Sequence, residues 1–157
     1  MSGEVARAAG RYGLAPVLGQ CPGVGATGVT LGGGLGWLSG MHGASCDNLL
    51  SARVITADGR TLVADANNHQ DLFWALRGAG GNFGVATSLE FHLHPITAVT
   101  GGDIHYSASD ARTVLRSFRE LMDEAPDSFQ ATLNLTRGER GVFVSFCHAG
   151  NENEVDR

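Results

Sequence analysis

The amino-acid sequence predicts an α+β fold, in which helices and antiparallel strands follow one another without a regular strand–helix–strand alternation. Two observations predict this class. Segments with the apolar spacing of a helix alternate irregularly with pairs of β-prone segments, and a glycine-rich stretch interrupts the first half of the chain. With 157 residues, the chain has the size of one domain and is long enough to bury a core.

In the first half, the expected elements are a helix, a hairpin and a second helix. Residues 2–12 have a helical pattern that ends at Gly13, a residue suited to a helix C-terminus. Residues 51–64 form two β-prone runs around Asp58-Gly59, a preferred hairpin turn. A second amphipathic helix is expected at residues 69–77, with Leu72, Phe73 and Leu76 on one face. The large aromatic side chains expected in the core are Trp37, Phe73 and Trp74.

In the second half, strands surround one helix. Alternating patterns predict strands at residues 83–93 and 101–107, and a last strand pair at 129–135 and 142–148. Between them, a helix begins at Ser109 or Asp110 and runs to about residue 124. Its buried face is expected to consist of Val114, Leu115, Phe118, Leu121 and Met122.

The composition excludes several classes of function. The net charge is −5, without the clustered Lys and Arg that bind nucleic acid or an anionic membrane surface. No apolar run is long enough to span a bilayer, and residues 1–4 do not begin a signal peptide. The three cysteines are far apart, so no disulfide framework is expected. His92 and His94 share a strand face but lack a third ligand for a metal. We therefore expect a cytoplasmic protein without a metal site.

Glycine is the outlier of this composition. The chain has 23 glycines, and ten of them lie between Gly19 and Gly43. A flexible linker would mix glycine with Ser, Pro and charged residues, whereas Val24, Leu31 and Trp37 are interleaved here. This pattern predicts a backbone that passes close to a bound group or adopts positive φ repeatedly.

One subset of these glycines has the spacing of a dinucleotide-binding motif. Gly23-Val-Gly25-Ala-Thr-Gly28 is a literal G-x-G-x-x-G, which in a Rossmann fold follows a strand and opens a continuous helix. Pro22 removes the amide that such a strand needs. The helix would contain four further glycines, at roughly 1 kcal/mol each relative to alanine. The surroundings therefore argue against a Rossmann fold and leave an NAD enzyme as a weak alternative.

A longer pattern is far more specific. Gly19-x-Cys21-Pro22-x-Val24-Gly25-x-x-Gly28 is followed by Leu31-Gly-Gly-Gly-x-Gly36-Trp37 and His42-Gly43-x-x-x-Asp47-Asn48. Further along come Val54-Ile-Thr-Ala-Asp-Gly59, Asp71-Leu-Phe-Trp-Ala-Leu-Arg-Gly78 and Gly80-Gly-Asn-Phe-Gly-Val85. Over about residues 13–95, these blocks resemble the vanillyl-alcohol oxidase superfamily, in its berberine-bridge-enzyme-like branch, whose FAD-binding domain is of the PCMH type.

The resemblance implies bound FAD. This cofactor has a pyrophosphate and a flat ring, and both need bare backbone nearby. The resemblance places Gly32 to Gly36 against the cofactor and the backbone of Val85 near its adenine end. Asp47 and Asn48 are expected to support the loop through bonds to its backbone. The predicted cofactor-binding residues are Cys21, Val24, Gly25, Gly28, Gly32, Gly33, Gly34, Gly36 and Val85.

Cys21 has the most specific chemistry. In the branch that the sequence resembles, a cysteine at this position can bond to the flavin ring, alongside a histidine on an earlier loop. The alternative is a small buried side chain, which is how most free cysteines behave and what we expect for Cys46 and Cys147. None of the six histidines matches the partnering position. The catalytic base of the family falls beyond Arg157, so the catalytic residues are unknown.

The resemblance also predicts two domains. Residues 1–95 are expected to form the second half of the FAD-binding domain, and residues 96–157 the beginning of an α+β substrate domain. Both ends are expected to be truncated, with residues 151–157 beginning another helix.

In its intact form, the protein is expected to be an FAD-dependent oxidase or dehydrogenase. A hydride would pass to the flavin from a small-molecule substrate, such as an alcohol, a sugar or a secondary metabolite. The alternative is a catalytically silent module that binds no flavin and associates with itself or with another chain. Self-association is expected in either case, because an incomplete domain exposes apolar surface.

Overall fold

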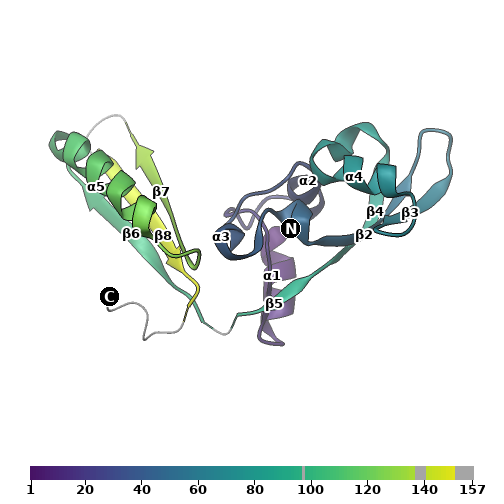
Figure 1. Ribbon diagram of the computed structural model, residues 1–157, viewed down its shortest axis with the longest axis horizontal. Coiled ribbons are helices and arrows are strands. Elements are labelled where there is room, and N and C mark those ends of the chain that lie inside the picture. The colour runs from purple at the N-terminus through teal and green to yellow at the C-terminus, as the bar shows by residue number, and fades with distance from the viewer. Residues whose placement is uncertain (97, 137–140, 151–157) are drawn as a thin grey trace. The chain divides into compact units, whose positions relative to one another are not determined.

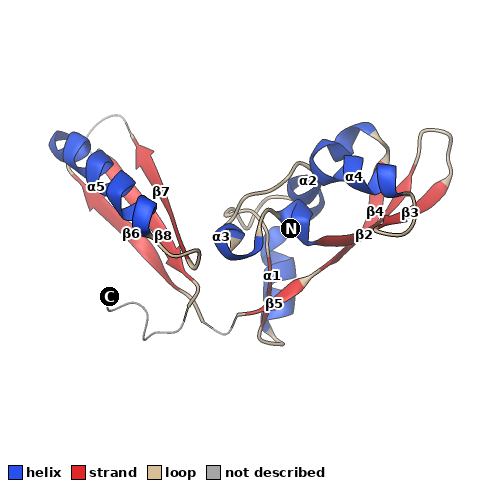
Figure 2. Cartoon of the chain, in the orientation of Figure 1, coloured by secondary structure: helices blue, strands red, loops and turns tan. Residues whose placement is uncertain are grey.

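The computed structural model divides the chain into two units, Met1–Thr97 and Ala98–Arg157 (Figure 1). It describes residues 1–96, 98–136 and 141–150. The helix expected at 151–157 lies outside the described residues. The fold is α+β, as the sequence predicts (Figure 2).

The first unit begins with a helix and a short strand. Helix α1 (Ser2–Gly10) ends at the C-cap residue Arg11, earlier than the predicted end at Gly13, which follows with a left-handed φ of 68°. Strand β1 (Leu14–Pro16) pairs antiparallel with β5 (Leu93–Pro95), which lies at the other end of the unit in sequence. This pairing ties the two ends of the first unit together.

A three-stranded antiparallel sheet forms the centre of the first unit. It consists of β2 (Leu49–Ile55), β3 (Thr61–Asp65) and β4 (Val85–Phe91), in the order β3-β2-β4. The β2–β3 hairpin turns at Asp58-Gly59, with Gly59 at φ 80°, so the predicted hairpin is confirmed. Every strand pair among the described residues is antiparallel. The parallel pairing of a Rossmann fold is therefore not found in them.

Helices α2 (Ala26–Leu31) and α4 (Gln70–Ala79) contribute to the core of this unit. Phe73 and Leu76 are buried, as the helical spacing predicts. The prediction for Trp74 is wrong, because its side chain is 73% exposed. One residue along a helix is a rotation of about 100°, so the face that buries Phe73 and Leu76 turns Trp74 outward. The core cluster is Leu31, Leu49, Ala52, Val54, Ala64, Phe73 and Leu76.

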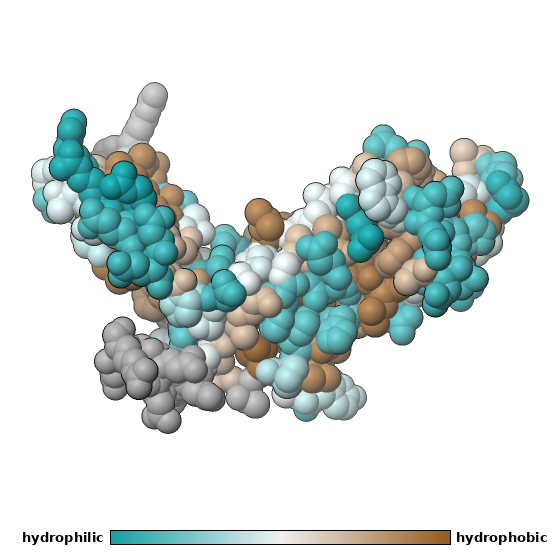
Figure 3. Space-filling model, viewed as in Figure 1, coloured by the Kyte–Doolittle hydropathy of each residue, from teal (hydrophilic) through white to brown (hydrophobic). Residues whose placement is uncertain are grey.

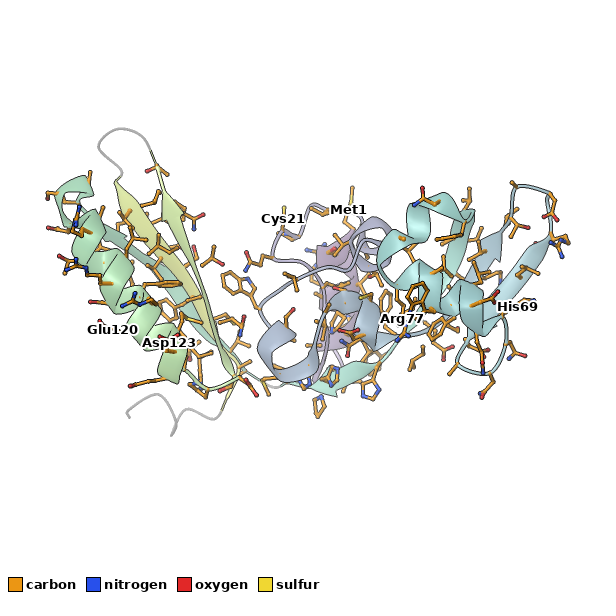
Figure 4. All side chains as sticks on the ribbon, turned by 45° about the horizontal axis from the view of Figure 1, so that its top comes forward. Met1, Cys21, His69, Arg77, Glu120 and Asp123 are labelled. Atoms are coloured by element: carbon orange, nitrogen blue, oxygen red, sulfur yellow. The ribbon has the colours of Figure 1, made fainter. Side chains whose placement is uncertain are left out.

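The second unit is a smaller α+β arrangement. Strands β6 (Thr100–Tyr106), β7 (Phe129–Leu135) and β8 (Val142–His148) form an antiparallel sheet with β8 in the centre. Helix α5 (Ala111–Glu124) runs along one face of this sheet, and Glu120 and Asp123 lie on its outer side (Figure 4). The predicted helix and strands are therefore all present.

Helix α5 buries less of its apolar face than the sequence suggests. Val114, Phe118 and Met122 are half-buried, whereas Leu115 and Leu121 are 43% and 51% exposed, which contradicts their predicted burial. A groove of about 400 Å³ remains beside α5, lined by Ile104, Tyr106, Asp110, Thr113, Val114, Ser117, Phe118, Leu121, Phe129, Val144 and Phe146.

Hydrophobic residues also remain on the surface of both units (Figure 3). Leu35 and Val85 in the first unit are 76% and 67% exposed, and Leu135 in the second is 62% exposed. Within the described part of the chain, no helix has the length and apolarity to cross a membrane.

Candidate cofactor site

The glycine-rich stretch is an ordered part of the first unit. The amide of Ser2 donates to Val24 O at 2.8 Å, which fastens the stretch to the start of α1. Further along, Ser45 N donates to Gly34 O at 2.7 Å and Cys46 N to Gly33 O at 2.9 Å. Since backbone hydrogen bonds hold the stretch at several points, it is not a flexible linker.

Some of its glycines are required by packing within the chain. A Cβ added at Gly34, where φ is 77°, would lie 2.6 Å from Ser45 Oγ. A Cβ at Gly36 would lie 1.8 Å from Leu18 O. Both distances are well below van der Waals contact. The structure therefore explains glycine at these two positions without any cofactor, a role that the sequence interpretation missed.

Packing within the chain does not explain several other glycines of this stretch. A Cβ added at Gly23, Gly25 or Gly28 would meet no atom within 4 Å. Gly25 has an ordinary φ of −66°, and Gly28 lies within α2, so neither backbone conformation demands glycine. Residues 21–28, here called the open segment, thus present bare backbone to their surroundings. This is the surface that a flat or phosphate-bearing group needs, and the open segment therefore fits FAD.

The remaining predicted glycines are intermediate cases. Gly33 has open space around its Cβ position but a φ of 104°, which side chains rarely adopt. A Cβ at Gly32 would lie 3.2 Å from Gly28 O, a tight contact.

The three cysteines differ in their surroundings. Cys21 is exposed, whereas Cys46 and Cys147 are buried. Burial raises the pKa of the Cys46 and Cys147 thiols, which keeps them protonated and unreactive. The buried role predicted for these two is confirmed. Figure 4 shows Cys21 near Met1, at the edge of the first unit, where its sulfur is accessible.

Two polar residues support the end of the glycine-rich stretch. Asp47 Oδ2 accepts from Ala44 N at 2.9 Å. Asn48, only 5% exposed, donates through Nδ2 to His42 O and to Ala44 O, both at 2.9 Å. The predicted support of the loop by side-chain to backbone bonds is therefore confirmed.

A histidine cluster next to Asn48 was not predicted. The rings of His42 and His94 stack with centroids 3.6 Å apart and 11° between their planes. His94 Nε2 lies 2.7 Å from Asn48 Oδ1, and the His92 ring is 4.6 Å from that of His94. Burial lowers the pKa of both His42 and His94. The sequence placed only His92 and His94 together, because nothing in a linear pattern brings His42 to them.

Val85 stands apart from the other predicted site residues. It begins β4 opposite Ile55, and no hydrogen bond among the described residues joins it to the open segment. The adjoining residue Gly84 has a φ of 140°, and a Cβ there would lie 2.3 Å from Ile55 O. The assignment of Val85 to the adenine end of the cofactor stays a prediction.

Comparison with known proteins gives these features a context. A family model described as an FAD binding domain matches residues 2–65. FAD-linked oxidoreductase OXR1 of Pyricularia oryzae is 54% identical over 143 residues, which cover 87% of this chain and 28% of that protein. (R)-6-hydroxynicotine oxidase of Paenarthrobacter nicotinovorans is 37% identical over 163 residues, covering 100% of this chain and 36% of that protein. The solved structure of Physcomitrella patens BBE-like 1 has a TM-score of 0.89 at 27% identity, covering 98% and 34%.

The fold and these similarities define a PCMH-type FAD-binding region like those of FAD-linked oxidoreductases. The chain belongs to the berberine-bridge-enzyme-like branch of the vanillyl-alcohol oxidase superfamily. It spans 28% to 36% of the length of the two relatives named above.

Proposed function

We propose that the protein is an FAD-dependent oxidase or dehydrogenase and that this chain supplies one wall of its cofactor site. The open segment carries the proposal. Packing within the chain does not require glycine at Gly23, Gly25 or Gly28, and most residues of the segment are exposed. Bound FAD supplies the acceptor for a hydride from the substrate. The substrate is a small molecule, such as an alcohol, a sugar or a secondary metabolite.

The residues of this chain would hold and orient the cofactor. Val24, which is 41% exposed, offers an apolar contact for a flat ring beside Cys21. Gly25 and Gly28 allow the cofactor to approach the backbone. We also propose that Cys21 is the covalent attachment point of the flavin, since it is the accessible one of the three thiols. The cytoplasmic location stays a prediction.

FAD titration of the 157-residue chain, followed by flavin fluorescence, tests this proposal. We expect saturable but weak binding, with a Kd above about 1 μM, because the chain covers only 36% of a related oxidase and holds only part of the contacts. Gly25→Val should abolish binding without changing the far-ultraviolet circular dichroism. Gly10→Val is the matched control, because Gly10 also has open space around its Cβ position but lies at the end of α1. If Gly25→Val and Gly10→Val lose FAD affinity equally, or if the unmodified chain does not bind FAD, the catalytically silent module is favoured.

We further propose that the chain associates with itself through its uncovered apolar surface. The exposed Leu115 and Leu121 on α5 and the groove beside them are the clearest part of this surface in the second unit. Sedimentation velocity is expected to show a sedimentation coefficient that rises with protein concentration. Leu121→Glu should weaken this dependence, and Arg119→Glu on the same helix should not. A monomer at every concentration would contradict the proposal.

A further inference from the structure

His42 and His94 join two segments that are far apart in the sequence. His42 is the last residue of the short helix α3 (Ser39–His42), and His94 lies in β5. Their rings stack in parallel at 3.6 Å. Asn48 completes the connection, because its amide group donates to two carbonyl oxygens on the His42 side and its Oδ1 faces His94 Nε2. With both amide hydrogens engaged, Oδ1 can only accept, so His94 Nε2 carries the hydrogen.

We propose that His42, Asn48 and His94 form a proton-sensitive latch. In the neutral state, the latch holds the end of the glycine-rich stretch, at His42, against β5, and protonation of the two histidines loosens it. The latch acts through contacts within the chain and needs no bound flavin.

The surroundings of the two rings disfavour positive charge. Two parallel imidazolium rings at this separation repel each other. The buried Nε2 of His42 has no hydrogen-bond partner among the described residues, so a proton added there lacks an acceptor. Neither ring forms an ion pair with a carboxylate in the described part of the chain.

The other titratable groups around the latch do not offset this repulsion. His92 lies against His94 and adds a further positive charge when protonated. On the 3₁₀ helix η1 (Ser45–Asn48), Cys46 has a raised pKa through burial, and the Asp47 carboxylate accepts from Ala44 N–H. Strand β1, opposite β5, contains no titratable side chain.

The contacts of η1 connect the latch to the glycines. Asn48 lies in η1 together with Ser45 and Cys46, whose amides donate to Gly34 O and Gly33 O. Repulsion between the protonated rings draws His94 away from Asn48, and η1 then loses its side-chain link to β5, while the backbone bond from His92 N to Asn48 O at 2.8 Å remains. The hydrogen bonds that shape Gly33 and Gly34 then open more often.

The direction of the pH effect follows from the lowered pKa of both rings. Their ordinary value is 6.5, so below that pH the unfolded chain binds more protons than the folded chain. Stability from the latch is therefore present above about pH 6.5 and decreases as the pH falls below it.

Hydrogen exchange of the Ser45 and Cys46 amides in the 157-residue chain tests the latch. After correction for the intrinsic exchange rate, we expect protection to fall about tenfold between about pH 7.5 and pH 5.5 in the unmodified chain. His42→Phe keeps a flat ring without a titrating group, and His94→Gln keeps a donor for Asn48. In each of these variants, the protection of the two amides should change little between the two pH values. In His105→Gln, in the second unit, it should still fall about tenfold.

Two outcomes would overturn the latch. One is unchanged protection in the unmodified chain at the lower pH. The other is a full tenfold fall in both His42→Phe and His94→Gln. If His42→Phe does not fold, the test uses His94→Gln together with an NMR titration of the His42 ring in the unmodified chain. An ordinary pKa for that ring would contradict the proposal.

Discussion

Replacing Gly36 with alanine is expected to destabilise the unit Met1–Thr97 strongly. The new Cβ would lie 1.8 Å from Leu18 O and 2.9 Å from Leu18 C, both of them backbone atoms. Gly36 and Leu18 are buried, so neither segment can move into free space. Overpacking of this kind costs typically about 1–3 kcal/mol and more when backbone must shift, against a total stability of roughly 5–15 kcal/mol. Urea denaturation followed by circular dichroism measures the loss.

Gly28→Ala is the matched variant for this experiment. Gly28 lies in α2 with open space around its Cβ position. Alanine is favoured over glycine in a helix by about 1 kcal/mol, so the first unit should become slightly more stable. At the same time FAD binding should weaken, because the added methyl group lies on the open segment. If Gly36→Ala and Gly28→Ala destabilise the chain equally, the division of the glycines into packing and open positions is wrong.

This division shows where reasoning from the sequence reached its limit. The dense glycines indicated close approach of backbone to a bound group, and Gly25 and Gly28 retain that interpretation. Gly34 and Gly36 have a different reason, because Ser45 and Leu18 occupy the space of a Cβ there. These neighbours are brought close by tertiary folding, and a linear pattern contains no signal for them.

Local signals were more informative. The Asp58-Gly59 turn predicted its hairpin because the turn type depends on the two residues themselves. Phe73 and Leu76 were placed correctly because helical spacing fixes one buried face. Trp74 was misplaced because its size suggested burial, although its position on the helix turns it outward.

The stacking of His42 on His94 is the clearest case of a contact that the sequence could not show. In sequence, His42 precedes β2 and His94 follows β4, and the antiparallel pairing of these two strands, with Leu49 opposite Phe91, brings the two ends together. Asn48, in contrast, was assigned correctly to loop support because Asx side chains bond readily to nearby backbone.

Cys21→Ala is expected to remove a flavin tether while leaving the fold intact. Cys21 is exposed, so trimming its side chain leaves no cavity, and surface substitutions of this kind change stability by less than about 0.5 kcal/mol. An electron-withdrawing tether favours the reduced flavin ring. Its loss should therefore lower the flavin reduction potential and slow substrate oxidation in the flavin-containing protein, while substrate binding is retained.

Peptide mass spectrometry after proteolysis gives the decisive measurement on Cys21. In protein isolated with its flavin, we expect a flavin-sized addition on the peptide that contains Cys21, and no addition in Cys21→Ala. Cys46→Ala is the matched control, because burial raises the pKa of that thiol and keeps it from reacting. An unmodified Cys21 thiol in active, fully flavin-loaded protein would refute the tether. The exposed position of Cys21 would then need another explanation, since free cysteines without a chemical role are mostly buried.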